Sequence, residues 1–101
     1  MRLEGQVALV TGATRGIGKA IALELGAQGA VVIGTATSQA GAAEIQKTLE
    51  TAGIKGEGTV LNVTDAAACE ALIDDIAKQY SAVSILVNNA GITRDNLAMR
   101  M

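Results

Sequence analysis

Three glycines that follow a predicted strand could bring the backbone close to a bound phosphate group. The strand is predicted over residues 6–10, and a helix is predicted to begin near Gly16. In this setting Gly12 permits a tight exit from the strand, Gly16 lets the backbone approach a pyrophosphate, and Gly18 lets the helix pack closely on the strand. The helix N-terminus adds unpaired N–H groups and the positive end of a dipole. The spacing is G-x-x-x-G-x-G, and the alternative interpretation is a glycine-rich turn without a ligand.

The segment after the second predicted strand lacks an acidic residue. Sites that hold NAD place Asp or Glu about 20 residues after the glycine loop. Here residues 34–41 contain none, and the first acid is Glu44. Thr37 and Ser38 can donate hydrogen bonds to a ribose 2′-phosphate, and Arg15 can add positive charge. The pattern favours NADP(H) over NAD(H); the alternatives are helix capping for Thr37 and Ser38 and a solvated side chain for Arg15.

A third polar segment, Asn88-Asn89-Ala90-Gly91, follows the strand predicted over residues 83–87. Asn side chains can bond the backbone of neighbouring strand ends. The small Ala-Gly pair leaves room for a ligand at the position where open parallel sheets form their binding crevice. An Asn-rich turn without a ligand is the alternative.

Short apolar runs alternate with helical patterns along the chain, which predicts an α/β fold. Strands are predicted over residues 6–10, 30–33, 58–63 and 83–87, and helices over about 16–28, 38–52 and 66–80. Gly29 and Gly53 stand where a glycine would end the first two helices, and Asp65 is a suitable N-cap for the third. The spacing between strands predicts a parallel sheet with right-handed crossovers.

Two of the helices carry apolar stripes that predict their packed sides. The stripe of the first helix is Ile17, Ile21 and Leu25. The stripe of the third helix is formed by Cys69, Leu72, Ile73, Ile76, Ala77 and Tyr80. This spacing assigns Cys69 and Tyr80 to the core. Residues 92–101 show no clear periodicity. If the four strands lie in the order 3-2-1-4, the strand over 83–87 is at the end of the sheet and is predicted to be an open apolar edge.

The composition argues against several classes of protein. Half of the residues are hydrophobic, the net charge is −2 and only one residue is aromatic, which excludes a disordered chain and a basic nucleic-acid-binding surface. The absence of His and the single Cys argue against a metal site, a Ser-His-Asp triad and an internal disulfide. No signal peptide or membrane span is recognised. We expect a cytoplasmic protein without metal, nucleic acid or membrane.

The glycine loop together with the Asn-Asn-Ala-Gly segment resembles the short-chain dehydrogenase/reductases. More narrowly, residues 32–38 and 88–101 look like those of the bacterial 3-oxoacyl-[acyl-carrier-protein] reductases. The resemblance implies a Rossmann-type doubly wound parallel sheet, with its first four strands in the order 3-2-1-4 and helices on its flanks. It also implies NADPH-dependent reduction of a 3-oxoacyl thioester, carried by acyl carrier protein, to the 3-hydroxyacyl form in fatty-acid biosynthesis. A homo-oligomer, specifically a tetramer, is implied for the full-length protein.

The resemblance also assigns cofactor-binding residues. The glycine loop, with Thr37 and Ser38 beyond it, would hold the phosphates; the loop residues are Gly12, Ala13, Thr14, Arg15, Gly16, Ile17 and Gly18. Asn62 and Val63 would flank the adenine. The nicotinamide-ribose side would be lined by Asn89, Ala90 and Gly91.

Two departures limit what these residues can do. The family usually carries Asp where Ser84 stands, so looser local hydrogen bonding is expected there. The family's catalytic Ser, Tyr-x-x-x-Lys pair and supporting Asn are expected beyond Met101, since Tyr80 is followed four residues later by Ser84 rather than Lys. Residues 1–101 are therefore predicted to be the N-terminal, cofactor-binding part of a single Rossmann domain. The alternatives are a non-catalytic NADP(H)-binding module, an inactive fragment, or another short-chain ketone reductase.

Overall fold

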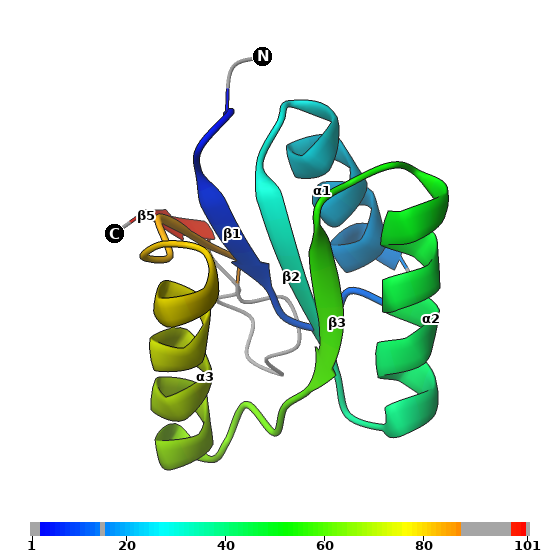
Figure 1. Ribbon diagram of the computed structural model, residues 1–101. Helices are drawn as coiled ribbons and strands as arrows, with labels where there is room; N and C mark the ends of the chain where they lie inside the picture. The colour runs from blue at the N-terminus through cyan, green and yellow to red at the C-terminus, as the bar shows by residue number, and fades with distance from the viewer. Residues whose placement is uncertain (1–2, 15, 88–97, 101) are drawn as a thin grey trace.

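Strands and helices alternate along the chain, as the sequence predicts. The computed structural model describes residues 3–14, 16–87 and 98–100 (Figure 1). The strands are β1 (Val7–Val10), β2 (Val31–Ala36), β3 (Gly56–Val60), β4 (Ile85–Val87) and β5 (Ala98–Arg100). The helices are α1 (Gly16–Ala27), α2 (Gln39–Thr51) and α3 (Ala66–Gln79). Among the described residues, no helix is both long and apolar enough to span a membrane.

The strands form one sheet in the order β3-β2-β1-β4-β5. The first four in the chain run parallel, with β1 between β2 and β4. The order 3-2-1-4 is therefore confirmed. Because consecutive parallel strands need crossovers, the helices must cover the faces of the sheet.

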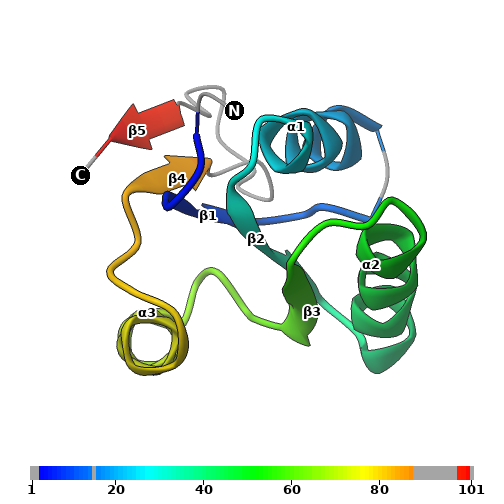
Figure 2. The same ribbon diagram turned by 45° about the horizontal axis from the view of Figure 1, so that its top comes forward.

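Helices α1 and α2 lie on one face of the sheet and α3 lies on the other (Figure 2), and alternate residues of the strands pack against these opposite layers. Val10 and Val32 face α1 and α2, where they meet Ala22, Ile45 and Leu49. Val7, Leu9 and Ile33 face α3, where they meet Ile76. Since β1 and all but the first residue of β2 are buried, these strands are marked by apolar runs rather than by alternating patterns, which is typical of a doubly wound sheet.

Local signals set the ends of the helices. The Ser38 side chain caps α2 and the Asp65 side chain caps α3, each accepting a backbone N–H bond at 3.1 Å. Gly29 and Gly53, which follow α1 and α2, have φ of 101° and 72°, a conformation that favours glycine. The predicted N-cap at Asp65 and the predicted stops at Gly29 and Gly53 are therefore confirmed, and Ser38 caps a helix as its alternative interpretation stated.

The predicted stripe of α1 is wrong at its first residue, because the side chain of Ile17 is 72% exposed. The buried residues of α1 are Gly18 and Ala22, whose small side chains let the helix lie close to the sheet. Ile17 is rotated by about 100° from Gly18 around the helix, so it points away from this contact. Ala77 of α3 is likewise exposed.

The prediction of an open edge at β4 is also wrong. Ala98–Arg100 forms β5, which pairs antiparallel with β4 in the register Ile85↔Arg100 and Val87↔Ala98. Strand pairing uses backbone groups, so a segment without side-chain periodicity can satisfy an otherwise unpaired edge. The edge at the opposite end of the sheet is β3.

Candidate functional site

The loop after β1 lies across the carboxyl ends of three strands. The backbone N–H of Thr11 donates to the carbonyl of Val87 on β4 at 3.0 Å. Two residues later, the N–H of Ala13 donates to the carbonyl of Thr35 on β2, also at 3.0 Å. Between these two bonds Gly12 has φ of 65°. The left-handed glycine thus lets the chain turn from the β4 side to the β2 side within one residue.

Gly16 stands at the start of α1 with φ of 66°. A Cβ built at this glycine would meet no atom within 4 Å, so the backbone faces open space there. Gly18, two residues later, is buried against the sheet. Gly12 and Gly16 therefore have left-handed backbones, Gly16 faces open space and Gly18 is buried, while the contact of the loop with a ligand stays a prediction.

The start of α2 meets the same loop. A Cβ built at Gly41 would lie 3.4 Å from the Thr14 methyl and 3.4 Å from the Ser38 hydroxyl oxygen. That oxygen accepts the N–H of Gly41 at 3.1 Å. The cap uses the hydroxyl as an acceptor, so its own hydrogen can still be donated outward. Thr37, the residue before it, is exposed. Thr14, Thr37 and Ser38 therefore gather polar donors at one corner of the carboxyl edge.

A second polar turn follows β3. Leu61 extends the pairing with β2, since its N–H donates to the carbonyl of Ala36 at 2.9 Å. The Asn62 side-chain oxygen then accepts both the N–H of Thr64 at 3.0 Å and its hydroxyl at 2.7 Å. These bonds fix an exposed amide at the carboxyl edge of β3, with the half-buried Val63 beside it.

A cavity of about 100 Å³ lies beneath this turn, on the α3 face of the sheet. It is lined by Leu9, Thr11, Leu61, Val63, Cys69, Ile73 and Leu86. The Cys69 thiol donates to the carbonyl of Val63 at 3.8 Å, which places the sulfur in the wall of the cavity. Residue spacing assigns Cys69 to the α3 stripe but does not reveal the cavity. The walls of the cavity come from β1 and the loop after it, the turn after β3, β4 and α3, so no single segment carries the pattern.

Several predicted residues lie outside the described part of the chain. These are Arg15, Asn89, Ala90 and Gly91, together with Asn88. Within the described ranges, no cluster of three or more His, Cys, Asp or Glu side chains could hold a metal ion.

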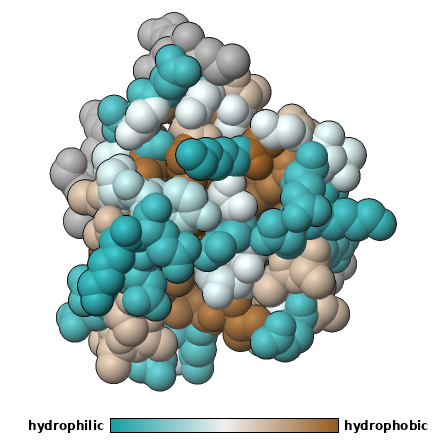
Figure 3. Space-filling model, in the orientation of Figure 1, coloured by the Kyte–Doolittle hydropathy of each residue, from teal (hydrophilic) through white to brown (hydrophobic). Residues whose placement is uncertain are grey.

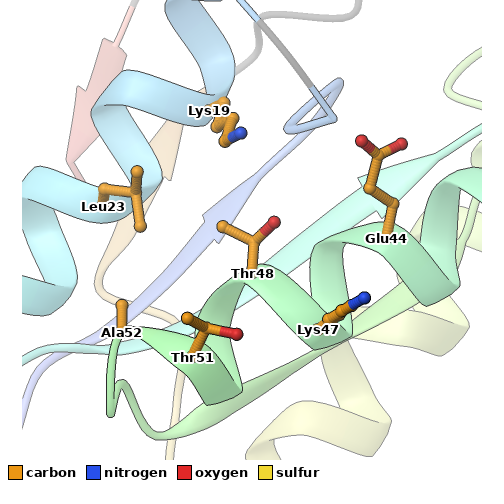
Figure 4. Close-up of a pocket in the computed structure, with 7 residues that line it drawn as sticks. All are labelled: Lys19, Leu23, Glu44, Lys47, Thr48, Thr51 and Ala52. Carbon is orange, nitrogen blue, oxygen red and sulfur yellow. The ribbon is translucent and has the colours of Figure 1, made fainter.

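A larger groove, of about 510 Å³, lies between α1 and α2 on the outside of the molecule (Figure 4). Its lining residues are Lys19, Leu23, Glu44, Lys47, Thr48, Thr51 and Ala52. The groove contains both charge signs and none of the residues predicted to bind a cofactor. In the space-filling view, hydrophilic side chains cover much of the surface and apolar residues appear between them (Figure 3). Size alone therefore does not identify the site.

Tyr80 lies away from the carboxyl edge, at the end of α3. It packs against the core on the α3 face. Burial, together with the negative charge of Glu57, raises the pKa of the Tyr80 phenol above its ordinary value. A raised pKa favours the neutral phenol, which is opposite to what a proton-transferring tyrosine near neutral pH requires.

Ser84 holds the beginning of β4 against β1. Its hydroxyl donates to the Gln6 side-chain oxygen at 2.6 Å and accepts the N–H of Val7 at 3.3 Å. The expected loosening at this position is therefore not what the structure shows. A serine can replace an acidic acceptor here because one hydroxyl both donates and accepts.

Comparison with known proteins agrees with the fold. A model of the short chain dehydrogenase family matches residues 6–101. The chain is 59% identical over 99 residues to "3-oxoacyl-[acyl-carrier-protein] reductase FabG" of Haemophilus influenzae, covering 98% of this chain and 40% of that protein. It is 58% identical over 101 residues to the Escherichia coli protein of the same name, covering 100% of this chain and 40% of that protein. The chain thus spans about 40% of the length of the curated relatives it matches.

Proposed function

The chain belongs to the short chain dehydrogenase family, and from this premise we propose that it forms the dinucleotide-binding part of an NADPH-dependent 3-oxoacyl-[acyl-carrier-protein] reductase. The observation that carries the proposal is the loop after β1. It has left-handed glycines at Gly12 and Gly16 and lies across the carboxyl edge between β4 and β2. The names and the identities of the relatives support the substrate class.

The glycine loop would hold the pyrophosphate of the dinucleotide. Open space beside the Gly16 backbone allows a phosphate oxygen to approach the first N–H groups of α1, which have no partner within the helix. The positive end of the α1 dipole favours the anion further. NADPH, when bound, supplies the hydride for the reduction. The proton donors are proposed to lie beyond Met101, in the family's Ser and Tyr-x-x-x-Lys positions.

The corner formed by Thr14, Thr37 and Ser38 would select NADPH over NADH. A ribose 2′-phosphate needs hydrogen-bond donors and is repelled by carboxylates. Thr37 is exposed at this corner, and the Ser38 cap leaves its hydroxyl hydrogen available. Capping and phosphate binding are thus compatible roles for Ser38, because they use different parts of one hydroxyl.

The turn after β3 would bind the adenine. The Asn62 amide is oriented by Thr64, and its NH₂ group can donate to a ring nitrogen. The apolar cavity behind Val63 offers a surface against which a planar ring can pack.

The whole protein is proposed to be a cytoplasmic homo-tetramer in which residues 1–101 form the first part of a single Rossmann domain. Two features support the assignment to part of a domain. The matched relatives are about two and a half times as long as the chain, and all four parallel strands share one sheet.

The test is a pair of measurements on the whole polypeptide that carries these residues. Calorimetric titration with NADPH and NADH is expected to show tighter binding of NADPH, and a 3-oxoacyl thioester is expected to be reduced. Binding without turnover of any ketone would favour the non-catalytic module. Turnover of other ketones, with 3-oxoacyl thioesters left unreacted, would favour another short-chain reductase. Failure to bind either dinucleotide would refute the proposal.

A further inference from the structure

We propose that Gln46 of α2 closes the outer edge of β3 against strand addition by a second copy of this chain. The inference concerns the end of the sheet where, among the residues that the structure describes, β3 has β2 on one side and no strand on the other (Figure 1). It is independent of dinucleotide binding.

The pairing with β2 shows which backbone groups of β3 face outward. Val32 N–H donates to the carbonyl of Lys55, and Leu61 N–H donates to the carbonyl of Ala36. Backbone groups alternate in direction along a strand, so the odd-numbered residues from 55 to 61 turn toward β2. The groups of Gly56, Gly58 and Val60 therefore face away from the sheet, with Gly58 at the centre.

The carboxyl half of β3 is suited to pairing. Thr59 and Val60 are residue types that favour strands, and Val60 is 41% exposed. An exposed strand edge of this kind is a template for a further strand. A partner strand that paired along β3 would need the central N–H of Gly58.

Gln46 occupies that N–H. Its side-chain oxygen accepts the N–H of Gly58 at 3.1 Å, and its NH₂ group donates to Glu50 at 2.9 Å. The bond to Glu50, one turn further along α2, orients the amide so that its oxygen faces the strand. Gly58 makes the contact possible: a Cβ there would lie 2.2 Å from the Ala42 carbonyl, so only glycine lets α2 come this close.

The chain contains a matched control for Gln46. Gln28, next to the end of α1, makes the same type of bond to Glu24, four residues before it, at 3.1 Å. This bond joins Gln28 to α1 and does not involve β3. Gln46→Leu and Gln28→Leu therefore each remove one Gln–Glu pair and add similar apolar surface, but only the first frees the edge.

Both variants are made in the whole polypeptide. Gln46→Ala serves as a second variant in case Gln46→Leu does not fold. Amide hydrogen exchange is measured at Gly58 at low concentration, and light scattering is measured over a range of concentrations. Removing Gln46 is expected to speed exchange at Gly58 about fivefold, as for one ordinary hydrogen bond, and to produce species larger than wild type as concentration rises. Gln28→Leu is expected to match wild type in both. Any of three results would overturn the proposal. These are unchanged exchange at Gly58, wild-type mass for the Gln46 variants at all concentrations, and equal association of Gln46→Leu and Gln28→Leu.

Discussion

Replacing Gly16 by alanine separates the phosphate-binding role of this glycine from its role in folding. Gly53 provides the comparison, because it has nearly the same backbone conformation at a different place. The φ angles are 66° at Gly16 and 72° at Gly53, and a Cβ at either position would meet nothing within 4 Å. Gly53 follows α2 and is not part of the carboxyl-edge loop.

The two substitutions should destabilise the fold by similar amounts. A left-handed conformation costs a non-glycine residue about 1–2 kcal/mol, and the stiffer unfolded chain offsets part of this. We therefore expect each variant to lose about 1 kcal/mol of unfolding free energy and to melt a few degrees lower. Chemical denaturation of both variants checks this equality.

The affinities for NADPH should differ sharply. The Gly16→Ala methyl group would stand in the open space through which a phosphate oxygen must approach the start of α1. Losing one charge-assisted hydrogen bond costs about 1.5–3 kcal/mol, so the dissociation constant should rise about 10- to 100-fold. Gly53→Ala should bind NADPH as tightly as wild type. Equal affinities for all three proteins would refute the assignment of the loop, and equal weakening in both variants would show that the effect comes from folding.

Three further predictions concern other residues. Ser38→Ala and Asp65→Ala should each cost about 1 kcal/mol of stability through loss of a helix cap, but only Ser38→Ala should lower the ratio of NADPH to NADH affinity. Gly58→Ala should lower the unfolding free energy by about 1–3 kcal/mol in urea denaturation, because its Cβ would overlap the Ala42 carbonyl; a wild-type midpoint would contradict the close packing of α2 on β3. Because burial and Glu57 raise the pKa of Tyr80 above its ordinary value of 10.0, the unfolded chain loses the phenol proton first, so the contribution of Tyr80 to stability should be full below pH 10 and should be lost as the pH rises above it. Tyr80→Phe should remove this part of the decline, and an identical alkaline profile for wild type and variant would count against it.

The sequence predicts the fold well because its signals are local. The buried strands β1 and β2 are marked by short apolar runs, and helix ends are marked by Ser38, Asp65, Gly29 and Gly53. Each of these residues acts within one turn of its own position. The order of the strands then follows from the short crossovers between them and from the family resemblance.

The errors arise where a distant partner decides the outcome. β5 forms because β4 offers an edge, and no pattern within residues 98–100 announces that pairing. Ile17 is exposed because Gly18 and Ala22 bring another side of α1 onto the sheet. The cavity behind Val63 and the contact of Gln46 with Gly58 depend on several elements at once. Periodicity within one segment cannot predict such features.

Glycine content alone does not identify the candidate site, because glycines serve two different purposes in this fold. At Gly34 and Gly58 a Cβ would collide with α2, at 2.7 Å from an Ile45 methyl and 2.2 Å from the Ala42 carbonyl. These glycines allow a helix to lie close to the sheet. Gly16 has the opposite surroundings, with a positive φ and open space beside its backbone. Beside a glycine needed for packing, atoms of the protein itself occupy the space. Where a glycine faces open space at a helix N-terminus, the N–H groups of the first helical turn stay accessible to a ligand. The phosphate-site hypothesis therefore rests on where Gly16 stands and what surrounds it, and a methyl group placed there is its most direct test.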